Sequence, residues 1–228
     1  MWKTLFRTVQ FGDLGHLLSP AFFRVFPVAK MRRAVGELMS NYRDRATFEQ
    51  VVDERRHRLQ EADIPVELEP EATVGGDTRP SDGRQLLTVL ELNRKRFGHR
   101  DESLVWAPGR VYVQWDEEFL DGVRTLYRGF YLERDEEFDA GLAKLGLEGM
   151  GDLFAAHFGG GEQRAVQFEM EHFHTSFEDI LARAREEGRT LHYQFAPLGV
   201  YLATLYDHLD RLDGTYDVRS IAEKVLTP

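Results

Sequence analysis

The chain has 228 residues, of which 42% are hydrophobic, and its 29 Lys and Arg against 39 Asp and Glu give a formal charge of −10. This apolar content excludes a wholly disordered chain and predicts a buried core. The absence of cysteine excludes disulfides, thiolate metal sites and cysteine nucleophiles. The sequence contains no run of about 18 apolar residues and no signal-peptide pattern, so we expect a cytoplasmic protein without a spanning helix.

The charge is divided unevenly along the chain. Residues 1–62 contain 11 Lys and Arg against 7 Asp and Glu, whereas residues 63–228 contain 18 against 32. A nucleic-acid-binding domain needs a basic face for the phosphates, so the acidic part argues against a nucleic-acid partner. Only the first quarter of the sequence favours an anionic surface.

Residues 1–62 predict a basic helical extension. Its last helix is expected to begin at a capping box formed by Thr47 and Gln50. Residues 63–83 are rich in Pro, Gly and acids and predict a linker or long loop. From Arg84 the spacing of leucines predicts a helix that ends near Gly98.

Residues 84–228 predict an acidic helical domain with one small β-hairpin at about 103–115. Two strand-like runs, 104–106 and 111–115, flank a Pro-Gly pair. After them we expect helices alone, with Asp116 and Asp217 as amino-terminal caps. The predicted fold class is therefore mainly α, a helical bundle-like domain with one hairpin.

His99-Arg100-Asp101 has the spelling of a kinase catalytic loop, and Asp116 follows where a kinase places its metal-binding Asp. With the helical rhythm that continues from there, residues 84–226 resemble the carboxy-terminal lobe of the UbiB/AarF-like atypical kinases. The resemblance implies catalytic roles for Asp101 and Asp116. The motifs are degraded, however: Trp106 stands where the metal-binding Asn is expected, and no glycine-rich nucleotide loop precedes them. The resemblance therefore implies a kinase-like lobe without its chemistry.

A second group of candidates lies in a Glu-x-x-His pattern. Glu171 with His174, and Glu169 with His172, each place a carboxylate and an imidazole on one helical face, as in di-metal helical bundles. A complete site needs carboxylates from further helices as well. The alternative is an exposed polar stripe opposite buried Phe168, Phe173 and Phe177, and this is the interpretation we favour.

The basic amino terminus is the remaining candidate surface. It combines an apolar stripe with nearby cations, a pattern typical of docking on a partner or on an anionic membrane surface. The residues concerned are Trp2, Lys3, Phe6, Arg7, Lys30, Arg32 and Arg33.

The sequence thus favours a non-catalytic helical protein-interaction module, with a protein partner or a second copy of itself and no cofactor. Two alternatives stay open at this point. One is a di-metal carboxylate oxidoreductase built on the Glu-x-x-His steps, and the other is a peripheral membrane-surface module that docks through residues 1–33.

Overall fold

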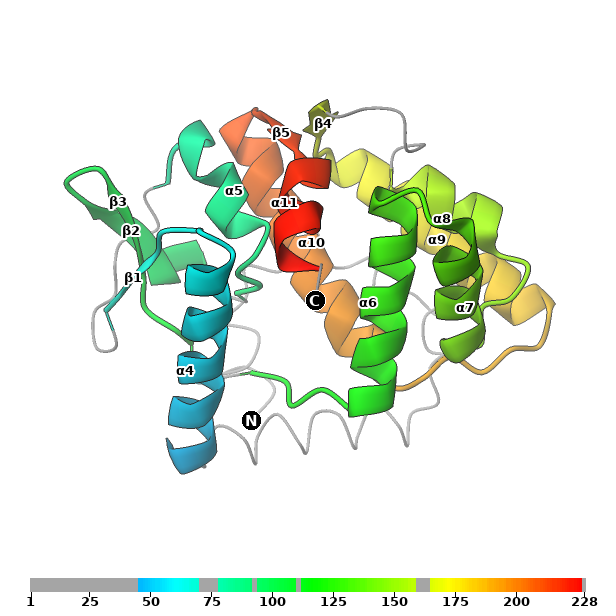
Figure 1. The fold of residues 1–228 in the computed structure, drawn as a ribbon. Coiled ribbons are helices and arrows are strands. Elements are labelled where there is room, and N and C mark those ends of the chain that lie inside the picture. The colour runs from blue at the N-terminus through cyan, green and yellow to red at the C-terminus, as the bar shows by residue number, and fades with distance from the viewer. Residues whose placement is uncertain (1–44, 70–77, 92–93, 110–111, 159–164, 227–228) are drawn as a thin grey trace, which may run out of the picture.

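The computed structural model describes residues 45–69, 78–91, 94–109, 112–158 and 165–226. Within these ranges the chain is mainly helical, which confirms the predicted fold class (Figure 1). In chain order the elements are α4 (Arg45–Glu61), β1 (Glu67–Leu68), η1 (Pro80–Asp82), α5 (Gly83–Leu86), η2 (Arg94–Arg96), β2 (Phe97–Arg100), β3 (Ser103–Trp106), α6 (Glu117–Tyr131), α7 (Asp135–Lys144), α8 (Gly151–His157), β4 (Ala165–Gln167), α9 (Met170–Glu186), α10 (Phe195–Leu212), β5 (Thr215–Asp217) and α11 (Val218–Val225).

Two small sheets connect distant parts of the chain. In the first, β3 is the central strand, paired in parallel with β1 and antiparallel with β2. In the second, β4 pairs antiparallel with β5, so that Val166 lies opposite Tyr216. The first sheet therefore joins the end of α4 to the hairpin, and the second joins the start of α9 to the end of α10.

The hairpin exists, but its position differs from the prediction of 103–115. Its two strands are β2 and β3, and the turn is Asp101-Glu102, where Asp101 adopts the left-handed φ of 56°. Residues 112–115 are not a strand. Ala107 still donates to the carbonyl of Arg96, but Pro108 has no N–H with which to continue the pairing. The chain therefore leaves the sheet at the Pro-Gly pair instead of turning back on it.

Two predicted helix boundaries are also wrong. The helix expected from Arg84 to Gly98 ends as α5 at Leu86, because residues 97–100 pair with β3 and this tertiary pairing overrides the local leucine spacing. Thr47 lies inside α4, which already includes Arg45, so the predicted capping box is not the start of that helix.

Other helix boundaries agree with the sequence. Asp116 caps α6 by accepting a hydrogen bond from the backbone N–H of Phe119, and Asp217 caps α11 in the same way with Ser220. Gly146 and Gly188 follow α7 and α9 with φ of 71° and 66°, the conformation that glycine adopts most readily at a helix end.

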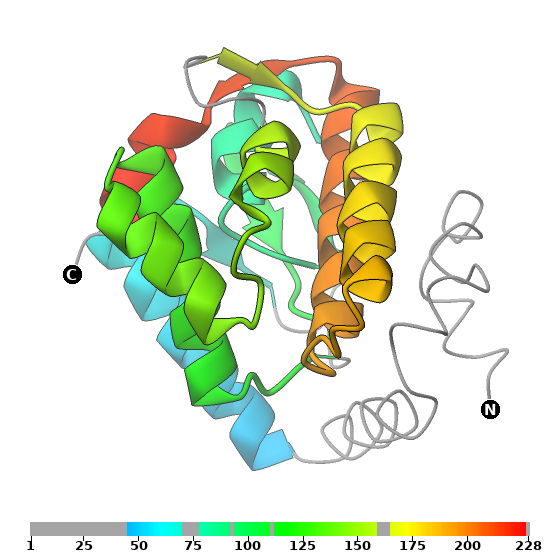
Figure 2. The same cartoon turned by 90° about the vertical axis from the view of Figure 1, so that its right-hand side faces the viewer.

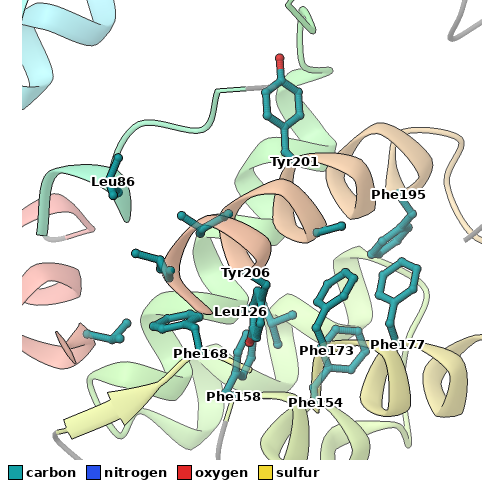
Figure 3. Close-up of a cluster of buried hydrophobic side chains, with 14 of the residues drawn as sticks. Leu86, Leu126, Phe154, Phe158, Phe168, Phe173, Phe177, Phe195, Tyr201 and Tyr206 are labelled. Atoms are coloured by element: carbon teal, nitrogen blue, oxygen red, sulfur yellow. The ribbon is translucent and has the colours of Figure 1, made fainter. Parts of the chain in front are cut away.

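The helices enclose one hydrophobic core. Helix α7 packs antiparallel against α6, α8 lies against α9, α9 against α10, and α11 covers the other side of α6 (Figures 1 and 2). Buried aromatic side chains fill the space between α8, α9 and α10 (Figure 3). The same cluster continues to Trp106 in β3 and to Leu59 in α4, so α4 shares the core of the acidic part.

Candidate functional site

The structure places the two kinase-like aspartates in different parts of the molecule. Asp101 is exposed in the β2–β3 turn, whereas Asp116 is exposed at the amino-terminal end of α6 (Figure 1). The Asp116 carboxylate accepts the Phe119 N–H at 3.1 Å and so acts as a helix cap. The two carboxylates therefore do not form one site in this structure.

The Glu-x-x-His residues form the polar side of the first turns of α9. Glu169, Glu171 and His172 are exposed and His174 is half-buried. On the opposite side Phe168, Phe173 and Phe177 are buried. Within the described residues no group of three or more His, Asp or Glu side chains is arranged to hold a metal ion.

The candidate docking residues of the amino terminus lie outside the described residues. They are Trp2, Lys3, Phe6, Arg7, Lys30, Arg32 and Arg33. In the part of the chain that the structure does describe, no helix is long and apolar enough to span a membrane.

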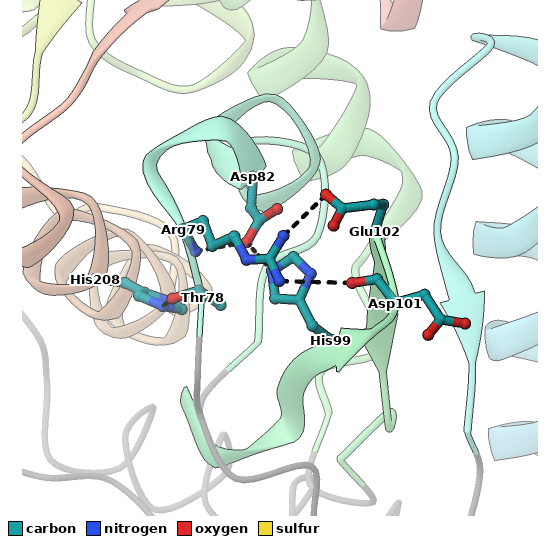
Figure 4. Close-up of polar contacts among 7 residues, drawn as sticks. All are labelled: Thr78, Arg79, Asp82, His99, Asp101, Glu102 and His208. Carbon is teal, nitrogen blue, oxygen red and sulfur yellow. Dashed lines mark hydrogen bonds and ion pairs between the residues drawn. The ribbon is translucent and has the colours of Figure 1, made fainter.

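Among the described residues, a set of buried polar groups lies where η1, β2 and α10 meet (Figure 4). The Asp82 side chain is 6% exposed and that of His99 is 10% exposed, and the carboxylate lies 2.7 Å from the imidazole Nε2. The backbone N–H of Arg79 donates to the same carboxylate oxygen at 2.6 Å. Asp82 is thus a buried carboxylate with two hydrogen bonds, which compensate its desolvation.

The other ring nitrogen of His99 distinguishes this pair from an ordinary buried ion pair. Its Nδ1 is buried and has no hydrogen-bond partner among the described residues. The side chain of Arg79 extends over the pair toward the β2–β3 turn, where it contacts Glu102 at 3.1 Å and the carbonyl of Asp101 (Figure 4). The side chains of Arg79 and Glu102 are 47% and 93% exposed, so this ion pair contributes little to stability and holds Arg79 over the Asp82–His99 pair only weakly.

His208 of α10 completes the cluster. Its Nε2 lies 2.7 Å from the hydroxyl of Thr78, and its ring lies 5.8 Å from that of Phe97. Burial, together with the positive charge of Arg94, lowers the pKa of His208 to about 4. His208 is therefore a neutral imidazole at neutral pH.

Tyr216 of β5 packs against Gly83, the residue that follows Asp82. A Cβ on Gly83 would lie 1.7 Å from the Tyr216 ring, so only glycine at position 83 allows the ring to lie there. Burial raises the pKa of the Tyr216 hydroxyl, and the charge of Asp82 adds to the effect. This hydroxyl also lacks a hydrogen-bond partner among the described residues.

A second buried polar set lies between α8 and α9. The Nδ1 of His157 is 2.8 Å from the hydroxyl of Ser176, and the ring of His172 contacts the backbone carbonyl of His157. Ser176 also bonds the carbonyls of its own helix, so its hydroxyl has the partners of a core residue. Burial lowers the pKa of His157 to about 4.

A cavity of about 30 Å³ adjoins His157, between α6, α8, α9 and α10. Apart from His157 and Tyr127 its lining is apolar, and burial raises the pKa of Tyr127 far enough to keep its hydroxyl protonated. Ligand sites are usually far larger than this cavity and contain several convergent polar groups, so the cavity is a poor candidate for a substrate site.

Comparisons of this chain with models of known protein families, with curated proteins and with solved structures gave no match.

Sequence reasoning did not find the buried cluster. Asp82 falls in the segment predicted as a linker, and Thr78 and His208 are separated by 130 residues. His99 was singled out only as part of a triplet whose expected catalytic member was Asp101. The pairing of β2 with β3 turns His99 inward and leaves Asp101 exposed in the turn. The His-Arg-Asp sequence by itself does not indicate which of its residues is buried.

Proposed function

We propose that this protein is a non-catalytic helical module that acts by binding another protein. The observation that carries the proposal is that the candidate catalytic side chains either have a structural role or lie apart from one another. Asp116 caps α6, Asp101 lies in a two-residue turn away from it, and the Glu-x-x-His carboxylates are an exposed stripe on α9.

In this proposal the part of the chain that resembles an atypical kinase lobe is a scaffold, without the residues that phosphoryl transfer requires. Phosphoryl transfer depends on metal ions held by positioned side chains. At the position of the expected metal-binding Asn, Trp106 is fully buried in β3 and donates its indole N–H to Glu91. A side chain in that environment supports packing of the hairpin and offers nothing to a metal ion.

The acidic side of α7 is the surface that we propose for the partner. We define it by its exposed carboxylates, which have no ion-pair partner within the described ranges: Asp135, Glu136 and Asp139. Val225 is the one large hydrophobic side chain exposed in the described part of the chain. Because this surface lacks an apolar patch, recognition there depends on charge, and the partner we propose has a basic surface.

A photo-cross-linking amino acid at Ala140, which is exposed on α7, tests the partner surface in cells that make the protein. We expect one defined adduct, with a second protein or a second copy of this chain, and fewer adducts from Thr175 on α9. Neutralising Asp135, Glu136 and Asp139 as Asn, Gln and Asn should lower the yield at least fivefold. The matched control neutralises the exposed Glu171, Glu178 and Asp179 of α9 in the same way, and it should leave the yield unchanged.

Two measurements would overturn the non-catalytic proposal. Phosphoryl transfer from Mg²⁺-ATP that the Asp101→Asn variant abolishes would establish a kinase. About two iron or manganese atoms per purified chain, lost in the Glu171→Gln variant, would establish the di-metal enzyme. An equal loss of cross-linking in both neutralised variants would contradict the assignment to α7.

A further inference from the structure

The cluster around His208 fastens one part of the molecule to another. We call η1, α5, β2 and β3, with the residues from Thr78 that join them, the hairpin unit. Besides the packing of α5 on α10, three side-chain contacts of the described residues connect this unit to α10: the Thr78 hydroxyl on the His208 imidazole at 2.7 Å, the Phe97 ring on the same imidazole, and Arg94 on Asp207 at 3.7 Å. Two of these side-chain contacts involve His208.

The charges that face His208 come from several elements. Arg94 of η2 and Arg211 of α10 disfavour a positive imidazole, whereas Asp82 of η1 favours one. Asp207 is shared between the two arginines through ion pairs of 3.7 and 3.0 Å. The charge of Asp82 is in turn shared with His99 of β2, at 2.7 Å, and the neutral hydroxyl of Tyr216 in β5 lies within its influence.

The carboxylates that would stabilise a protonated His208 are already bonded to other groups. Asp82 already accepts hydrogen bonds from His99 and from the Arg79 backbone, and Asp207 is occupied by two guanidinium groups. A proton on His208 would therefore add a buried positive charge between two cations. Burying a charge without a dedicated partner is costly, and such a site relieves the cost by opening to water.

We propose that His208 is an acid-sensitive latch, which holds the hairpin unit on α10 while it is neutral and releases the unit when it is protonated. The Thr78 contact is not what breaks, because a hydroxyl can accept from an imidazolium as well as donate to an imidazole. The release follows from the cost of the buried charge. Helix α10 keeps its position because it also packs against α9.

The pKa of His208, lowered to about 4 by burial and by Arg94, supports the geometric argument. In water the imidazole is half-protonated near pH 6.5, so opening becomes more favourable as the pH falls from about 6.5 toward 4. We expect such an opening to be local, because the aromatic side chains between α8, α9 and α10 hold these three helices together without the hairpin unit (Figure 3).

The chain contains no cysteine, so a single introduced thiol reports the opening of one position. Val89→Cys places it in the hairpin unit, where Val89 is 4% exposed, and Ala184→Cys places it in α9 at a fully buried position. A dipyridyl disulfide, which reacts with thiols at acid pH, measures the labelling rate of each variant from pH 7 to pH 4. We expect the rate at position 89, relative to that at position 184, to rise at least tenfold over this range.

The variant His208→Gln keeps a hydrogen-bonding group for Thr78 but cannot titrate, so we expect it to abolish the relative acceleration. The control His157→Asn removes the other buried imidazole of lowered pKa and should leave the acceleration in place. Equal acceleration at both positions, or acceleration that persists in His208→Gln, would overturn the latch. Arg94→Gln is a second, independent variant: it should reduce the acceleration, and an unchanged ratio would show that the charges around His208 are not its cause.

Discussion

At the scale of single residues, the buried amide of Gln194 joins two segments that are far apart in the sequence. Its side chain is inaccessible to solvent, accepts a hydrogen bond from the backbone N–H of Asp116 at 2.8 Å and donates one to the carbonyl of Gln114 at 3.0 Å. The amide thereby satisfies two backbone groups of the segment that leads into α6. It also fixes the point at which α6 begins.

We therefore expect Gln194→Leu to lower the free energy of unfolding by about 2 kcal/mol, because it removes the hydrogen-bond partner of two partly buried backbone groups. Urea denaturation measures the change. Gln114→Ala is the control, since the Gln114 side chain is exposed and only its carbonyl takes part, and its effect should stay within about 0.5 kcal/mol. Similar losses in the two variants would contradict the role of the Gln194 amide.

Also at this scale, the residues show which parts of the candidate site a sequence can predict. Asp116 and Asp217 were identified as caps because capping depends on neighbours within three residues. Asp82 and His99 were not identified as a pair, since their contact depends on the path of the chain between them. Likewise no local pattern marks His208 as buried, yet it is 5% exposed because Thr78 and Phe97 of the hairpin unit cover that side of α10.

At the scale of elements, the packing of α7 on α6 depends on two glycines. A Cβ on Gly129 would lie 2.2 Å from the backbone nitrogen of Phe138, and one on Gly141 would lie 2.4 Å from that of Leu126. Backbone atoms within a helix cannot move aside as a flexible side chain can. The two helices are therefore closer than alanine would permit.

We expect Gly129→Ala or Gly141→Ala to destabilise the protein by about 3 kcal/mol through forced separation of the two helices, although alanine is the better helix former. Gly151→Ala is the matched control in α8, because its Cβ would meet only side-chain atoms, at 3.3 Å or more, and its stability should remain within about 1 kcal/mol. Thermal denaturation of the three variants distinguishes backbone contact from loss of glycine alone.

The amino-terminal cap of α6 is expected to contribute less to stability than the two glycines of the α6–α7 contact. Asp116→Ala removes the acceptor for the Phe119 N–H and a negative charge at the helix amino terminus, and should cost about 1 kcal/mol. Asp116→Asn should recover most of that loss, as measured by urea denaturation. A loss much larger than this in Asp116→Asn would indicate that the carboxylate has a role beyond capping.

The sequence predicted the elements better where the signals are local. Helices alone were expected after the hairpin, and α6 to α11 do form there, but β4 and β5 contradict the expectation because each strand is stabilised by pairing with the other. The strands were harder to place, because β1 and β3 are 38 positions apart in register and β4 pairs with β5 across 48 or more residues. No local pattern specifies which distant segment a strand of three or four residues will join.

At the scale of the whole molecule, two buried imidazoles make stability depend on pH. Burial lowers the pKa of both His157 and His208 to about 4 in the folded protein, whereas an exposed histidine titrates near 6.5. Between these values the unfolded chain binds protons that the folded chain does not. The free energy of unfolding should therefore be highest above pH 6.5 and fall as the pH drops toward 4, by about 3 kcal/mol for each histidine.

Urea denaturation at intervals between pH 7.5 and pH 4 measures this dependence. The double variant His157→Asn, His208→Gln should show a flatter profile than the wild-type protein over the same range, even if it is less stable throughout. An identical slope in both proteins would show that other groups, such as carboxylates, control the acid transition.

The contact between Gly83 and Tyr216 has a consequence for the order in which the protein acquires its structure. The two residues are 133 positions apart. Strand β4 can pair, and α6 can be covered, only after residues 215–225 have been made, because these residues form β5 and α11. Contacts of such long sequence separation form slowly, because they close large loops. On the ribosome, the hairpin unit would therefore remain uncovered through most of synthesis, with Leu86 and Phe97 accessible to chaperones until α10 and then Tyr216 have been added.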